Sequence, residues 1–246
     1  MKICVVGAGA IGGWMAGLLA EAGNDVSLFA RGETLAALQK SGLRVMRREK
    51  QSSYPLRASH DPSALGVQDV VVIATKGQSV PAIAPAVKAL CGPHTSIVPA
   101  VNGIPWWFFQ VKGVPLSSAS LASVDPDGTI AHAIVAERVI GCVVHASAWT
   151  PEPGVVDVNG EDKLIFGEPD GASSDRCKAL AAAFACDKPQ IVISENIRRD
   201  IWLKLWGNMS MNPLSVLTGG TTLQMLSEPD VRNLVREMML EMQRIG

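Results

Sequence analysis

The sequence lacks any long block of like charges, and its charges nearly balance. Lys and Arg number 22 and Asp and Glu number 23 among 246 residues, which leaves a formal net charge of −1. Charged residues make up only 18% of the chain, whereas hydrophobic residues make up 48%. Such a composition predicts a folded chain with a sizeable core. It gives no support to a nucleic-acid partner or a membrane surface.

The sequence also lacks paired cysteines and histidines at metal-ligand spacing. Its cysteines are odd in number, scattered, and without a C-x-x-C pair, which excludes a disulfide framework or a zinc site and suits a reducing cytoplasm. We therefore predict a cytoplasmic protein without a metal. The histidine in the strand-like run 141–149, His145, is expected to be packed rather than catalytic. The cysteines are Cys4, Cys91, Cys142, Cys177 and Cys186, and the other histidines are His60, His94 and His132.

The N-terminal segment combines an uncharged run with closely spaced glycines. Residues 3–20 carry no charge and could pass for the apolar part of a secretory signal. However, four glycines fall between Gly7 and Gly13, at the spacing that a dinucleotide site requires. A signal peptide does not need them, so we interpret this segment as mature structure.

The first part of the chain alternates strand-like and helix-like segments. Apolar runs predict strands at 2–6, 26–30, 69–76 and 96–103, and helices are expected between them. Residues 43–58 contain no long helix and predict a small antiparallel excursion. This alternation is typical of right-handed crossovers and a doubly wound parallel sheet.

The second part changes in pattern after Gly141. Residues 141–149, 154–158 and 163–168 predict strands joined by hairpin-like turns, and a helix at 173–185 with a strand at 191–194 is expected to close the sheet. Beyond this, only helices are predicted, at 196–212 and 222–244. We therefore predict a Rossmann-type doubly wound sheet domain over residues 1–194, followed by an all-helical domain over residues 195–246.

The predicted helical domain is small. Two helices cannot enclose much core, because each must bury an apolar stripe against a partner. Either they pack on the sheet domain and on another subunit, as a homodimer, or the sequence is a truncated fragment. We favour truncation.

A glycine-rich loop follows the first predicted strand. Residues 7–12 read G-x-G-x-x-G and are Gly7, Ala8, Gly9, Ala10, Ile11 and Gly12. The first glycine permits a tight turn, the second lets the backbone approach a pyrophosphate, and the third lets the helix pack close to the strand. Between a strand and a helix, this motif predicts a dinucleotide cofactor on the backbone N–H groups at the helix end.

The end of the second strand bears on the choice of cofactor. Sites that select NAD usually end this strand with a carboxylate, but here Phe29 and Ala30 lead into Arg31. Arg31 is placed to meet a 2′-phosphate, so we predict NADP (NADPH), although Glu33 lies close by. Lys76 and Asn102 stand at the ends of later predicted strands, 69–76 and 96–103, and are expected at the same edge of the sheet.

A polar stripe interrupts the apolar run at residues 200–214. Lys204, Asn208 and Asn212 recur every fourth residue and share one helix face. Large apolar side chains flank them, so we expect Lys204 to be partly buried and its pKa lowered. A lysine of this kind can protonate the oxygen of a ketone that receives a hydride, while amides orient the substrate. The pattern indicates a reductase.

Together, the Gly7 loop, Arg31, Lys76, Asn102-Gly103 and the K-x-x-x-N-x-x-x-N-P run resemble the ketopantoate reductase (2-dehydropantoate 2-reductase) family. The resemblance implies NADPH-dependent reduction of a short 2-oxo acid, most simply 2-dehydropantoate to pantoate in pantothenate biosynthesis. It further implies a role for each site residue. Lys204 would be the general acid, Asn208 and Asn212 would hold the substrate, Asn102 would lie where nicotinamide meets substrate, Arg31 and Lys76 would serve the adenosine phosphate, and Ala146 would offer a backbone contact.

The sequence departs from this family in three ways. A serine and an acidic residue that members supply from later helices would lie beyond Gly246, and an asparagine shortly after the N-P pair is missing. The aromatic run Trp106–Phe109 follows Asn102 and is expected to pack in the core, but it would alter the substrate if it lined the pocket. The alternatives are a reductase of a different 2-oxo acid and a non-catalytic NADP-binding sensor.

Overall fold

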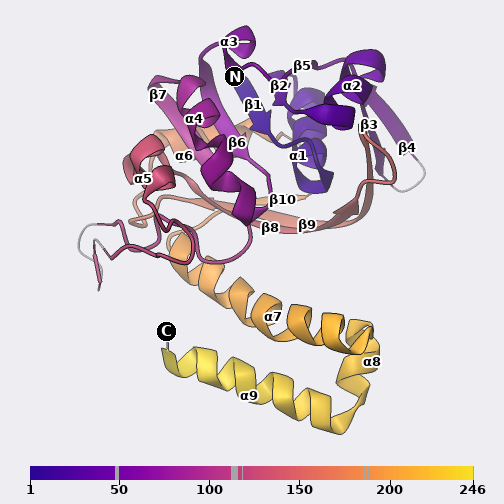
Figure 1. Cartoon of the computed structure of the whole chain (residues 1–246), viewed down its shortest axis with the longest axis vertical. Coiled ribbons are helices and arrows are strands. Elements are labelled where there is room, and N and C mark those ends of the chain that lie inside the picture. The colour runs from indigo at the N-terminus through magenta and orange to yellow at the C-terminus, as the bar shows by residue number, and fades with distance from the viewer. Residues whose placement is uncertain (48–49, 112–115, 118, 186, 188, 246) are drawn as a thin grey trace.

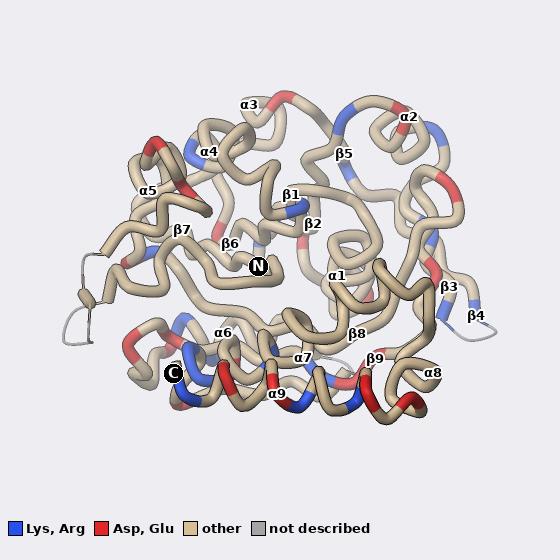
Figure 2. Tube along the Cα trace, turned by 60° about the horizontal axis from the view of Figure 1, so that its bottom comes forward, with Lys and Arg blue, Asp and Glu red and all other residues tan. Residues whose placement is uncertain are grey.

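The computed structural model of the chain describes residues 1–246 except 48–49, 112–115, 118, 186, 188 and 246. Of the cysteines, Cys186 lies outside the described residues, and the other four are free thiols. No described helix is long and apolar enough to cross a membrane. Lys and Arg lie interspersed with Asp and Glu, and neither sign forms a large block in this view (Figure 2).

A parallel sheet forms the first layer of the fold (Figure 1). Its strand order is β5-β2-β1-β6-β7, and all neighbours are parallel. The chain moves outward from β1 and then returns to β6, so the order reverses between these two strands, where ligands of doubly wound sheets bind. The strands are β1 (Lys2–Val6), β2 (Asp25–Phe29), β5 (Arg57–Ser59), β6 (Gln68–Ile73) and β7 (Cys91–Pro99).

Helices cover both faces of this sheet, which confirms the predicted Rossmann-type fold. Ile3 and Val5 face α1 (Ala10–Glu21), whereas Cys4 and Val6 face α4 (Val80–Ala89) and belong to a second core cluster. The alternation follows from the strand period of two residues, which sends successive side chains to opposite faces. The other helices described before β8 are α2 (Gly32–Ser41), α3 (Pro62–Leu65), η1 (Gly77–Ser79), α5 (Thr129–Ala133) and η2 (Ala136–Arg138).

A second, mixed sheet lies on the far side of α1, where the sequence predicted additions to the first sheet. Its long strand β9 pairs antiparallel with β8 and parallel with both β3 and β10, while β4 pairs with β3. The expected antiparallel excursion at 43–58 is confirmed in part, as β3 and β4. The elements are β3 (Leu43–Arg47), β4 (Lys50–Tyr54), β8 (Gly141–Trp149), β9 (Val155–Gly167), α6 (Asp175–Ala183) and β10 (Gln190–Ile193).

Strand β9 corrects the prediction of two strands at 154–158 and 163–168. It runs through the polar stretch between them without a turn. The ladder with β8 shifts register twice, because Ala148 pairs with Val158 and Ser147 with Gly160, after which His145 pairs with Lys163. Asn159 and Asp162 are thus extra residues in β-bulges, which absorb polar residues without ending a strand.

Helix α1 lies between the two sheets and approaches the second one through glycines. A Cβ atom added at Gly13 would lie 2.6 Å from Cγ2 of Val156, and one at Gly17 would lie 3.0 Å from Cγ2 of Val45. Gly13 has no room for a side chain unless Val156 moves, and at Gly17 Val45 would have to shift slightly, so the helix backbone packs closely against side chains of the strands.

The remaining helices leave the sheets as an antiparallel pair (Figure 1). Helix α7 (Ile197–Thr218) runs through Pro213, where the sequence predicted its end near residue 212; it stops at Gly219, whose φ of 65° provides a left-handed cap. The predicted helix 222–244 is instead two helices, α8 (Thr222–Ser227) and α9 (Pro229–Ile245). Proline disfavours helical backbone in the residue before it, so Glu228 is extended and Pro229 starts the new helix.

Candidate active site

The glycine loop forms a pocket at the carboxyl edge of β1, β2 and β6. Gly7 has a φ of 98°, and a Cβ there would meet Cγ2 of Thr75 at 2.7 Å. A Cβ at Gly12 would lie 1.9 Å from the carbonyl oxygen of Gly7, whereas one at Gly9 would have no atom within 4 Å. Gly7 and Gly12 therefore have no room for a side chain, while Gly9 faces open space before α1.

Three helices begin around this pocket. Gly9, Arg31 and Ser79 are the N-cap residues of α1, α2 and α4, and all three line it. Free N–H groups and the positive ends of helix dipoles favour anions at such points. Among the predicted cofactor residues, Ala8 also lines the pocket, and Ala10 and Ile11 lie in the first turn of α1. Lys76 is exposed and outside the lining, three residues beyond β6, which ends at Ile73 rather than at the predicted residue 76.

Sequence reasoning missed three hydroxyl residues of this pocket. Thr34 lies in the first turn of α2, Thr75 follows β6, and Ser79 precedes α4. Each follows the carboxyl end of a parallel strand, which is the signal that could have identified them once the strand order was known.

A second pocket lies farther along the same edge, beyond β7. Nζ of Lys204 in α7 donates to Oδ1 of Asn102 at 2.8 Å and to the carbonyl oxygen of Val144 in β8 at 2.6 Å. Asn102 follows β7, which ends at Pro99 rather than at the predicted residue 103. The structure thus brings together a lysine and an asparagine that are 102 residues apart in the chain.

Burial alters the protonation of the groups in this second pocket. It lowers the pKa of Lys204. Burial also raises the pKa of Cys142 to about 12, so its thiol stays protonated. Next to the pocket lining in β8, His145 has its pKa lowered by burial and then by the charges of Lys204 and Lys163. Lys204 is therefore the residue of this pocket best suited to give up a proton.

Of the polar stripe on α7, Lys204 and Asn208 line this pocket, and Asn212 does not. Asn208 is partly buried and lines it beside Leu205, but Asn212 is exposed one turn farther along and is not part of the lining. Among the described residues, no carboxylate lies within ion-pair distance of Lys204.

The aromatic run after Asn102 packs in the core. Trp106, Trp107 and Phe108 are 3%, 0% and 6% exposed, and Phe109 packs against the same cluster. None of them lines the pocket of Lys204. The expectation of core packing is confirmed, and the run gives no reason to change the predicted substrate.

Other predicted features are also located. Ala146 lies in β8 two residues beyond Val144 and pairs with Glu161. No group of three or more metal-ligating side chains occurs in the part of the chain that the structure describes.

Comparison with known proteins places this arrangement in a family. The family description "Ketopantoate reductase PanE/ApbA" matches residues 3–114, and "Ketopantoate reductase PanE/ApbA C terminal" matches residues 196–246. The chain belongs to the ketopantoate reductase family. It is 42% identical over 247 residues to a 2-dehydropantoate 2-reductase of Mesorhizobium japonicum, covering 100% of this chain and 76% of that protein.

Solved structures show the same fold. A ketopantoate reductase homologue from Ralstonia solanacearum MolK2 superposes with a TM-score of 0.96 at 46% identity, over 100% of this chain and 76% of that one. A D-mandelate dehydrogenase bound to NADH and anilino(oxo)acetate has a TM-score of 0.78 at 19% identity, over 96% of this chain and 70% of that one. The second likeness is one of fold alone.

Proposed function

We propose that the protein reduces the keto group of a short 2-oxo acid, 2-dehydropantoate first, with NADPH as the donor. This is the step that makes pantoate for pantothenate biosynthesis. One observation carries the proposal: the amine of Lys204 is partly buried, has a lowered pKa, and is held by Asn102 and Val144 beside a pocket. This combination suits a general acid for carbonyl reduction, which must be positioned and have a pKa near the working pH.

The residues of the first pocket fit a dinucleotide. The open space above Gly9 lets a pyrophosphate approach the backbone, and the N-terminus of α1 offers N–H groups to it. Arg31 lines the same pocket at the end of β2 and would pair with a 2′-phosphate, which favours NADPH. Lys76 is exposed nearby and would add to the positive potential. When bound, the dinucleotide supplies a hydride.

The residues of the second pocket would then orient the substrate and protonate it. Lys204 would donate a proton to the carbonyl oxygen as negative charge builds there, and Asn102 would hold the amine in place. The amide of Asn208, which makes no hydrogen bond among the described residues, would orient the carboxylate or hydroxyl of the substrate. Asn212 would join it only if the substrate reached one helix turn farther, and Ala146 would offer a backbone contact to the cofactor.

The test is NADPH consumption by the purified chain with 2-dehydropantoate, with NADH and other short 2-oxo acids as comparisons. We expect turnover with 2-dehydropantoate and a preference for NADPH. Faster turnover with another 2-oxo acid would instead support the alternative substrate. Saturable NADPH binding without any turnover would support the sensor. The cytoplasmic location, the homodimer and the domain boundary at residue 194 stay predictions.

A further inference from the structure

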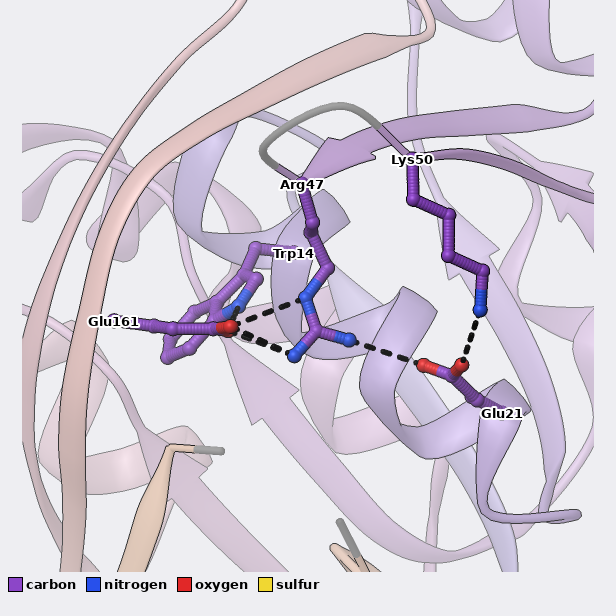
Figure 3. Close-up of polar contacts among 5 residues, drawn as sticks. All are labelled: Trp14, Glu21, Arg47, Lys50 and Glu161. Atoms are coloured by element: carbon purple, nitrogen blue, oxygen red, sulfur yellow. Dashed lines mark hydrogen bonds and ion pairs between the residues drawn. The ribbon is translucent and has the colours of Figure 1, made fainter. Parts of the chain in front are cut away.

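A series of charged side chains extends from Trp14 on the far side of α1 from the first sheet: Glu161, Arg47, Glu21 and Lys50 (Figure 3). Glu161 of β9 accepts from Nε1 of Trp14 at 3.1 Å and from Nη2 of Arg47 at 2.8 and 3.0 Å. Arg47 also donates to Glu21 at 3.1 Å, and Lys50 pairs with Glu21 at 3.7 Å. Glu161 therefore connects β9 to α1 both directly and through Arg47 of β3.

The bulges in β9 turn Glu161 toward α1. Val156, Val158, Leu164 and Phe166 belong to the core cluster that contains α1, and strict alternation would turn even-numbered residues to that face. Because Asn159 and Asp162 are extra residues, the odd-numbered Glu161 takes an inward place between them. Bulges of this kind re-aim a side chain.

The contact between Glu161 and Trp14 lies in a desolvated place. Trp14 is fully buried, and the side chain of Glu161 is 14% exposed. Among the described residues, Glu161 is the acceptor for the indole N–H. Removal of this carboxylate would leave a buried donor without a partner, which is costlier than loss of an exposed ion pair.

Strand β9 is also connected, through its partner strand β8, to Lys204, the proposed acid. Trp14 lies two residues after Gly12 in the helix that starts at the glycine loop. Glu161 pairs with Ala146 in β8, and the carbonyl of Val144 in that strand accepts from Lys204. The β8–β9 ladder thus contacts the helix that would hold the cofactor and the lysine that would protonate the substrate.

We propose that Glu161 is a positioning residue for the reaction, which fixes α1 against β9 and so sets the glycine loop relative to Lys204. The inference rests on the proposed function, because it requires a dinucleotide at the glycine loop. It adds a residue that touches neither cofactor nor substrate.

The test measures the Kd for NADPH by fluorescence titration, well below the unfolding temperature, for wild type, Glu161→Ala and Glu161→Gln. We expect Glu161→Ala to raise the Kd roughly three- to tenfold. Without its acceptor, the buried indole N–H destabilises the native position of α1, and a shift of α1 moves the glycine loop that would bind NADPH. Glu161→Gln keeps an acceptor oxygen and should restore the Kd to within about twofold of wild type. The kinetic isotope effect on turnover, measured with NADPH deuterated at the position of the transferred hydride, should also be larger for Glu161→Ala than for wild type.

The matched control is Glu152→Ala, which removes the carboxylate of the Arg44–Glu152 pair at 2.8 Å. Arg44 lies in β3 of the same sheet, and among the described residues the pair makes no hydrogen bond or ion pair with α1. The Kd of Glu152→Ala for NADPH should therefore stay at the wild-type value. If Glu161→Ala does not fold, Trp14→Phe removes the N–H donor together with part of the buried ring and should raise the Kd roughly twofold or more.

The outcomes separate the two claims. A folded Glu161→Ala, or a folded Trp14→Phe in its place, with a lower unfolding temperature but an unchanged Kd and isotope effect would show a purely structural role and overturn this inference. Failure of Glu161→Gln to restore the Kd would also contradict it. Absence of NADPH binding by the wild type would overturn the proposed function, and this inference with it.

Discussion

Lys204 and Asn102 meet through a hydrogen bond of 2.8 Å between Nζ and Oδ1, although one lies in α7 and the other in the loop after β7. With the carbonyl of Val144, this bond fixes two of the three N–H directions of the amine. The third remains for a ligand. The proposed acid is therefore oriented before a substrate arrives, and its partners become the first targets for substitution.

Replacement of Asn102 by Ala should lower turnover without abolishing it. The ammonium of Lys204 would lose one charge-assisted hydrogen bond, a contact that contributes about 1.5–3 kcal/mol, so we expect kcat to fall roughly 10- to 100-fold. Steady-state kinetics with NADPH and 2-dehydropantoate measure this. An unchanged kcat would show that Asn102 does not orient the acid.

The pH dependence of turnover should follow the ammonium of Lys204. The acid must carry its proton, so kcat should fall as pH rises through the pKa of Lys204. Burial lowers that pKa, so the fall should begin at a lower pH than an exposed lysine would give. A kcat that rises throughout the alkaline range would contradict this assignment.

The same shift has a consequence for stability. Between the lowered pKa of the folded chain and the ordinary value, the unfolded chain binds more protons, so the contribution of Lys204 to stability should increase with pH in that window. Denaturant unfolding of wild type and Lys204→Met across that window would measure it. If the difference in the free energy of unfolding between wild type and Lys204→Met did not change with pH, the pKa of Lys204 would not be lowered in the folded chain.

The sequence predicted the features that depend on local pattern. Residues 2–12 could be read as strand, loop and helix because apolar strand residues lead into glycines at fixed spacing, and the stripe on α7 followed from helix periodicity. The separation of the strands into two sheets was not predictable, because the pairing of β3 with β9 joins segments more than 100 residues apart. Likewise, Asn159–Asp162 resembles a turn, and only its partner strand makes it a pair of bulges.

Cofactor choice should depend on Arg31. Replacement of Arg31 by Ala removes a charged donor from the proposed 2′-phosphate site, so we expect the KM for NADPH to rise roughly 10- to 100-fold while the KM for NADH changes little. Lys40→Ala, in the exposed last turn of the same helix, is the control. An equal rise in the KM for NADPH and for NADH in Arg31→Ala would mean that Arg31 contacts a part that both cofactors have, and not the 2′-phosphate.

The glycines of the loop should separate folding from binding. Gly12→Ala places a methyl group 1.9 Å from the carbonyl oxygen of Gly7, so we expect a loss of roughly 1–3 kcal/mol in the free energy of unfolding. Gly9→Ala meets no atom within 4 Å and should unfold at the wild-type temperature, yet bind NADPH more weakly. Thermal unfolding and NADPH titration of both variants check this. Wild-type affinity in Gly9→Ala would place the pyrophosphate elsewhere.

The central claim is that Lys204 protonates a substrate reduced by NADPH, and a single-turnover experiment on Lys204→Ala tests it most directly. NADPH oxidation after rapid mixing with 2-dehydropantoate gives the chemical step, and titration gives the Kd for NADPH. We expect the step to slow by about 10²–10⁴-fold while the Kd for NADPH stays near the wild-type value. A wild-type rate of NADPH oxidation in Lys204→Ala would contradict the account.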